Sequence, residues 1–153
     1  MVTTIDRVQR NTAEEINRRL EAETGARIRR CMGNPLAIQR RLRQLDREWD
    51  IERVLETNAS LIALAGVLLG ARHDRRWLWL PSLVTGFLLQ HAVQGWCPPV
   101  PLLRRMGIRT SREIEIERVA LKILRGDFDE AASLATAAGG RHRADVAIAL
   151  AKA

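Results

Sequence analysis

A cysteine in the second half of the chain is the residue with the clearest nucleophilic chemistry. Cys97 follows Trp96 and precedes a pair of prolines. A partly exposed thiol there could carry a persulfide, a lipid or a metal ion if a nearby cation, such as Arg104 or Arg105, lowered its pKa. A structural cysteine is the alternative. The other cysteine, Cys31, lies far away among arginines, so we expect two reduced thiols.

A histidine lies in the apolar sequence just before this cysteine. His91 is the only ionisable side chain between Trp77 and Trp96. Ionisable groups inside membrane spans are candidate functional residues, and Gln90 and Gln94 add polar groups beside it. We therefore predict a candidate intramembrane polar site at His91, Gln90 and Gln94. A neutral histidine that is hydrogen-bonded to a helix neighbour is the alternative.

No other cluster of residues predicts catalysis or a bound group. The three histidines and two cysteines lack the spacing of metal ligands, and the chain has neither a Gly-rich phosphate loop nor a nucleophile elbow. We expect no catalytic residue, no cofactor, no metal and no enzymatic activity. Acidic residues alternate with arginines between Asp46 and Glu56, which argues against nucleic acid as a partner.

Two uncharged stretches in a basic chain must position these residues. The 153 residues carry a formal charge of +7, yet neither residues 57–71 nor residues 77–103 contain a charged side chain. As helices, the first stretch and the span from Trp77 to Trp96 would measure roughly 22 and 28 Å, against roughly 30 Å for a bilayer core. The two indoles would mark its edges. With only the basic loop 72–76 between them, the stretches predict a transmembrane helical hairpin; a soluble bundle with both in its core is the alternative.

Small and polar residues recur along both stretches. Gly66 and Gly70 form a GxxxG pattern, which lets two helix backbones approach closely. In the second stretch four residues recur every four positions and should avoid lipid and face another helix: Ser82, Gly86, Gln90 and Gln94. We predict a helix seam at Gly66, Gly70, Ser82 and Gly86. Packing within the hairpin and a seam between copies of the chain are both open.

Helices are also predicted before the hairpin. Thr12 and Glu15 fit a capping box that begins a helix ending near Cys31. Asn34 and Pro35 fit the N-cap and the first position of the next helix. That helix carries one apolar stripe, formed by Ile38, Leu42, Leu45 and Trp49. The apolar face changes over near residue 50, where we place the first boundary.

The chain after the hairpin begins with prolines. Pro98, Pro99 and Pro101 predict a non-helical exit, and residues 102–109 have an interfacial composition. Thr110 and Glu113 fit a second capping box, for a helix that extends to about residue 125 and ends at Gly126. An Ala-rich segment follows two glycines at 139–140.

The predicted fold class is therefore all-α, a helical hairpin membrane domain with helical extensions. Residues 1–50 form an N-terminal helical cytoplasmic segment, residues 51–103 the transmembrane hairpin, and residues 104–153 a C-terminal helical cytoplasmic tail that packs on the N-terminal helices. Nine arginines flank the hairpin against three in its loop, so the positive-inside rule places both termini in the cytoplasm. The basic flanks also favour anionic lipid headgroups as partners.

Several short segments are similar to a known family. Asp50-Ile51-Glu52-Arg53, Gly95-Trp96-Cys97-Pro98-Pro99 and Met106-Gly107-Ile108-Arg109-Thr110 resemble the YgaP-like inner-membrane domain. The resemblance covers residues 50–110. It implies a two-helix domain of the bacterial inner membrane, of unknown function, that occurs alone or fused to a rhodanese sulfurtransferase. The helical extensions on both sides lie outside it.

Together these features predict a small integral inner-membrane protein without enzymatic activity, which anchors or scaffolds an unidentified protein partner as a homo-oligomer. A sulfur-handling or redox membrane component that uses Cys97 is one alternative. A soluble helical oligomer with the hairpin as its core is another.

Overall fold

The chain folds entirely into helices over the part that the structure describes. A computed structural model describes residues 6–129, and within them every regular element is helical. In chain order the elements are α1 (Arg7–Arg10), α2 (Glu14–Cys31), α3 (Pro35–Leu45), α4 (Ile51–Arg72), the 3₁₀ helix η2 (Arg75–Leu78), α5 (Trp79–Gln94), α6 (Pro99–Arg105) and α7 (Ser111–Arg125). The predicted all-α class is thus confirmed.

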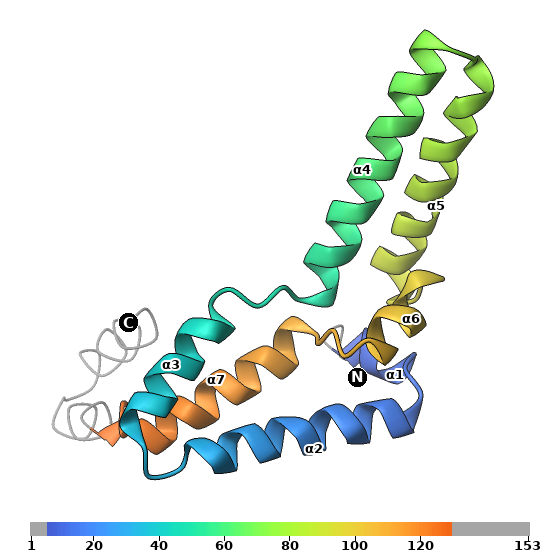
Figure 1. Ribbon diagram of the computed structural model, residues 1–153. Helices are drawn as coiled ribbons and strands as arrows, with labels where there is room; N and C mark the ends of the chain where they lie inside the picture. Colours follow the sequence, from blue (N-terminus) through green and yellow to red (C-terminus); the bar gives the residue numbers. More distant parts are fainter. Residues whose placement is uncertain (1–5, 130–153) are drawn as a thin grey trace, which may run out of the picture.

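The helices divide into two parts, which we call the hairpin and the base. The hairpin comprises α4, η2 and α5; Figure 1 shows α4 and α5 antiparallel and side by side, projecting away from the remaining helices. The base comprises α1, α2, α3, α6 and α7, with α7 packed against both α2 and α3. The predicted packing on the N-terminal helices is therefore observed for α7, the part of the C-terminal segment that carries these contacts.

The described residues form two apolar cores. The larger core lies among α2, α3 and α7 and contains Cys31, Ile38, Leu42, Leu45, Ile114 and Leu121. The smaller core lies where the hairpin joins the base and contains Val8, Ile51, Leu55, Cys97 and Val100. The second core binds α1 and α6 to the start of α4, so it holds the hairpin on the base.

Two predicted helix starts are confirmed by their caps, and a third cap lies at the predicted boundary near residue 50. The Asn34 side chain accepts a hydrogen bond from the Ala37 N–H, with Pro35 at the first helical position. Asp50 caps α4 by accepting from the Arg53 N–H, so the chain breaks at the predicted boundary before the hairpin begins. Thr110 caps α7 in a complete capping box with Glu113. Such caps satisfy amide groups that have no partner inside the helix.

Two predicted helix boundaries are wrong. Ala13, not Thr12, is the N-cap of α2, and no side chain caps this helix. The Thr12 hydroxyl instead lies against the end of α1, where it donates to the Val8 carbonyl. The helix that carries Ile38 ends at Leu45, so Trp49 lies beyond it, exposed and beneath the Arg53 guanidinium.

The prolines after the hairpin do not prevent a helix. Pro98 is the N-cap of α6, and Pro99 and Pro101 lie in its first turn. The first amide groups of a helix have no intrahelical partner, so a residue without an N–H loses nothing there. The predicted non-helical exit is therefore present only over residues 95–98 and is wrong from Pro99 onward. Gly126 ends α7 with a φ of 86°, as predicted, and the Ala-rich segment after residue 139 lies outside the described residues.

Candidate functional site: an apolar hairpin and its root

The hairpin exposes large apolar side chains along its whole length. They are Leu61, Ile62, Leu64, Val67, Leu68, Leu69, Trp77, Leu78, Trp79, Leu83, Phe87, Leu89 and Val93. Monomeric soluble proteins rarely expose continuous apolar patches of this kind. The hairpin is therefore a surface that needs an apolar environment, either lipid or other protein.

One helix of the described residues has the length and composition of a membrane span. It is α4, in which only 17% of the most apolar 18-residue window is buried. Core helices of soluble proteins can have the same composition, but they are mostly buried. The second arm is divided, since η2 precedes an α5 of 16 residues.

The glycines of α4 lie at the seam inside the hairpin. A Cβ atom on Gly66 would lie 2.5 Å from the Pro81 Cδ, and one on Gly70 would lie 2.7 Å from the Leu78 Cδ2. Both glycines are buried. Of the two roles left open for Gly66 and Gly70, the structure shows packing within one chain.

The polar stripe of α5 does not lie at this seam. Ser82, Gly86 and Gln94 are exposed and Gln90 is half-buried, and a Cβ on Gly86 would meet nothing within 4 Å. The expectation that this stripe faces a helix is therefore wrong within the single chain. A seam between copies at Ser82 and Gly86 stays a prediction.

The thiol of Cys97 is buried in the smaller core. Its residue is 3% exposed, packed with Val8, Ile51, Leu55 and Val100. Burial raises the pKa of the Cys97 thiol, which lowers the fraction present as reactive thiolate. Arg104, expected to activate it, binds other groups. Cys31 is buried in the larger core and is also a free thiol.

Arg104 instead forms a buried ion pair inside the base. Its residue is 0% exposed. The guanidinium donates to both carboxylate oxygens of Glu113, at 2.6 and 2.7 Å, and also to the Asn17 Oδ1 at 2.9 Å. A paired carboxylate is the partner that a buried guanidinium requires. The ion pair joins α6, which follows the hairpin, to α7 and α2.

A second buried network centres on Glu117. This carboxylate is 0% exposed and accepts from Arg109 Nη1 at 2.5 Å and from Arg41 Nε at 2.7 Å. Arg109 also donates through its Nε to Glu48 at 2.8 Å. Arg109 therefore connects α7 to the segment that enters the hairpin.

Both carboxyl groups are held in the charged form. Burial raises the pKa of Glu113, but hydrogen bonds from Arg104, the Thr110 N–H and Gln9 outweigh it, and the net pKa is lowered. Burial likewise raises the pKa of Glu117, and the Arg41 and Arg109 guanidinium groups reverse that effect. The attraction of the arginines exceeds the cost of desolvation at both acids.

These networks were not predicted, and Arg104 and Arg109 are two of the nine flanking arginines that were expected to meet lipid headgroups. That expectation is wrong, because side chains 0% and 3% exposed cannot reach a bilayer surface. A signal was available: Glu117 lies three residues after Ile114 and four before Leu121, on the apolar stripe of α7. An acid at a core position requires a buried cation.

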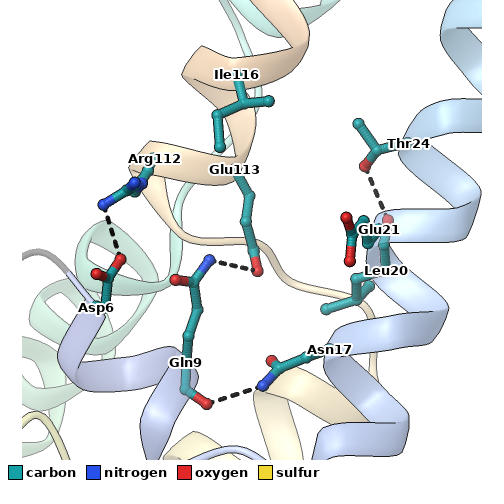
Figure 2. Close-up of a pocket in the computed structure, with 9 residues that line it drawn as sticks. All are labelled: Asp6, Gln9, Asn17, Leu20, Glu21, Thr24, Arg112, Glu113 and Ile116. Carbon is teal, nitrogen blue, oxygen red and sulfur yellow. Dashed lines mark hydrogen bonds and ion pairs between the residues drawn. The ribbon is translucent and has the colours of Figure 1, made fainter.

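The base also contains an open polar pocket of about 390 Å³ among α1, α2 and α7. Figure 2 shows the side chains that line it and the hydrogen bonds between them. Arg112 donates to Asp6 at 2.8 Å, and Gln9 donates to Glu113 at 3.1 Å. Asn17 donates to the Gln9 carbonyl oxygen at 2.8 Å. These polar groups satisfy one another and bind the three helices together.

A second pocket lies at the root of the hairpin, where α1 packs against α4 and α5. It contains His91, the predicted polar residue, together with Glu52 and Glu56 of α4. α1 covers the end of α5: Arg7 donates to the Ala92 carbonyl, and Asn11 donates to the Gln94 carbonyl. These bonds satisfy carbonyl groups that have no partner within α5.

The chain matches no protein-family model, no curated protein and no solved structure. The resemblance of residues 50–110 to the YgaP-like domain therefore stays a prediction. Within residues 6–129, no three His, Cys, Asp or Glu side chains converge in a way that could hold a metal ion.

Proposed function

We propose that this chain is a small integral membrane protein that uses its hairpin to anchor the helical base at the cytoplasmic surface, where the base acts as a non-enzymatic scaffold. The observation that carries the proposal is the exposure of the apolar side chains of α4 and α5. Six of them on α4 contribute about −2 to −4 kcal/mol in total to insertion, at about −0.3 to −0.6 kcal/mol each. They are Leu61, Ile62, Leu64, Val67, Leu68 and Leu69.

The lengths of both arms support a membrane-spanning hairpin. The 22 residues of α4 measure about 33 Å, of which the uncharged residues 57–71 account for about 22 Å. In the second arm, Trp77 and Leu78 of η2 and the 16 residues of α5 together measure about 28 Å, because a 3₁₀ helix rises about 2.0 Å per residue. A bilayer core is about 30 Å thick. The second arm therefore matches the core, and α4 reaches across it with its charged first two turns at the edge of the bilayer.

The distribution of exposed arginines supports cytoplasmic termini. The tip of the hairpin carries Arg72, Arg75 and Arg76. Of the nine arginines that flank the hairpin in the sequence, six are exposed: Arg40, Arg43, Arg47, Arg53, Arg105 and Arg112. The positive-inside rule then places the base in the cytoplasm. These exposed arginines are the ones that would meet anionic lipid headgroups.

A soluble oligomer is the second candidate, and one observation favours it. Only one helix of the described residues is long and apolar enough to span a membrane by itself. Copies that pack their hairpins together would cover the same apolar side chains without lipid. The burial of Cys97 makes the third candidate, a sulfur-handling role, the weakest.

Fractionation of cells that express the full chain tests the proposal. We expect the protein in the membrane pellet after high-salt and alkaline washes, with release by detergent. Recovery in the soluble fraction, as a defined oligomer in detergent-free buffer, would overturn the membrane assignment in favour of the second candidate.

A matched pair of variants makes the test specific to the hairpin. Leu64→Lys places a charge on the exposed face of α4, and Leu36→Lys places one on the exposed face of α3. At about +2.5 to +3.5 kcal/mol for a central lysine, L64K should lose most of its membrane fraction, whereas L36K should retain it. Equal retention of both variants would mean that α4 does not lie in lipid.

A further inference from the structure

The pocket at the root of the hairpin has the size and composition of a ligand site. Its volume is about 500 Å³, within the range of small-molecule pockets. One part of its wall is apolar, formed by Val8, Leu55, Leu88, Leu89 and Ala92. The other part is charged or polar, formed by Arg7, Glu52, Glu56 and His91. An occupant must therefore be amphiphilic.

Two polar atoms of this wall are buried and unsatisfied. The Glu52 Oε2 and the His91 Nδ1 have no hydrogen-bond partner among the residues that the structure describes. They come from α4 and α5, on the two arms of the hairpin. Buried polar atoms are normally hydrogen-bonded, so each of these two atoms can take a hydrogen bond from a bound group, while the Glu52 carboxyl group also accepts from the Ser111 N–H. A carboxylate oxygen accepts only, and an imidazole nitrogen can also accept.

The charges of the wall define the headgroup of that occupant. Glu52 and Glu56 supply two negative charges, and Arg7 supplies a positive charge. A headgroup with an ammonium and a phosphate matches both signs. A primary ammonium has three N–H donors for Glu52, Glu56 and His91, whereas a trimethylammonium has none. An anionic lipid would bring its negative charge against two carboxylates.

We infer that the root of the hairpin is a binding site for a phospholipid with a primary-ammonium headgroup of the ethanolamine type. The inference rests on the proposed membrane insertion, which brings the root to the depth of the lipid headgroups. The ammonium lies against Glu52, Glu56 and His91, the phosphate lies toward Arg7, and one acyl chain lies on the leucine wall.

The test compares two lipids that differ only in the headgroup amine. The full-length protein in detergent is titrated with dioleoylphosphatidylethanolamine or dioleoylphosphatidylcholine, and bound lipid is counted by native mass spectrometry. The ethanolamine lipid should bind about tenfold more tightly, as one charge-assisted hydrogen bond would give. Equal affinity for the two lipids would overturn the inference. Displacement of bound lipid by free ethanolamine at equal concentration would also overturn it, because the apolar wall would then contribute nothing.

Variants locate the preference in this pocket. Glu52→Gln removes the charge and should abolish the preference, and His91→Leu removes the acceptor and should reduce it. Glu15→Gln, at an exposed position of α2, makes the same change in charge and should leave the preference unchanged. Helical content measured by circular dichroism identifies a variant that fails to fold. If E52Q folds and still prefers the ethanolamine lipid, the assignment is wrong.

Failure of the proposed function gives a different result. A membrane-integrated protein that does not distinguish the two lipids disproves the lipid site alone. A protein that is soluble without detergent disproves the membrane role, and the pocket is then titrated with decylamine against decyltrimethylammonium in aqueous buffer. Preference for the primary amine, lost in E52Q, would support the recognition chemistry; no preference would overturn it.

Discussion

At the scale of single residues, the buried charges of the base are its most specific feature. Glu117 and Arg104 are both 0% exposed. Glu117 is paired with arginines, and Arg104 is paired with the Glu113 carboxylate. A buried ion pair stabilises little relative to an apolar core, but removing one partner leaves an uncompensated charge. The networks therefore act mainly as constraints that allow one arrangement of α2, α3, α6 and α7.

Glu117→Gln tests this constraint. The substitution keeps the volume and leaves two guanidinium groups, those of Arg109 and Arg41, with Glu48 as their one remaining carboxylate among the described residues, so we expect a loss of about 3 kcal/mol in the free energy of unfolding. Glu115→Gln is the matched control, because Glu115 forms only an exposed pair with Arg118, worth about 0–1 kcal/mol. Urea unfolding of both variants in mild detergent measures the difference. Similar losses in the two variants would mean that the buried network is not a constraint.

At the scale of elements, the hairpin depends on two glycines that let α4 approach η2 and the start of α5. The nearest atom to the missing side chain of Gly66 belongs to the Pro81 ring, which is rigid. Gly86, in contrast, faces open space. The same substitution at these two positions should therefore have opposite effects.

Gly66→Ala is expected to destabilise the hairpin by about 1–3 kcal/mol, because the added methyl group overpacks the seam. Gly86→Ala should stabilise α5 by up to about 1 kcal/mol, since alanine is the better helix former. Thermal unfolding followed by circular dichroism gives both signs in one experiment. Stabilisation by both substitutions would show that the seam inside the hairpin is looser than the structure indicates.

At the scale of the whole molecule, the base and the hairpin respond to different conditions. The base contains carboxylates with lowered pKa values, and the exposed face of the hairpin is apolar. A carboxyl group whose pKa is lowered on folding contributes stability above its unfolded pKa, and that contribution is lost as the pH falls through the folded pKa. Acid should therefore act on the base first.

We expect constant stability of the base between about pH 5 and 7 and a progressive loss as the pH falls below about 4, the ordinary pKa range of glutamate, because the unfolded chain then binds protons that Glu113 and Glu117 do not bind in the folded base. Helical signal from the base should decrease while detergent preserves the hairpin. Circular dichroism against pH measures the loss, and Glu117→Gln should remove much of its pH dependence. Loss of stability of the base as the pH rises from 5 to 7 would contradict the expectation that Glu113 and Glu117 dominate its pH dependence.

The sequence alone determined the features that depend on local spacing and local chemistry. The caps at Asn34 and Thr110 and the chain break at Asp50 are confirmed, and the two uncharged stretches form helices, because each of these features depends on residues within one turn or one helix. The helix α6 was not predicted, because a proline breaks a helix that has already begun but is tolerated in the first turn of a helix that begins there.

Only the tertiary structure decided which arginines are buried, which side of α5 packs on α4, and which groups surround Cys97 and His91. The reason is that the type of a charged residue does not tell whether its side chain is buried. Arg104 and Arg105 are adjacent in the sequence, yet Arg104 is buried against Glu113 and Asn17, whereas Arg105 is exposed. Contacts between distant segments, such as Arg109 with Glu48, determine burial. Gly66 lies at a seam because Pro81 of the second arm packs against it. His91 lies in a pocket because α1 covers the end of α5. Neither contact can be read from local spacing.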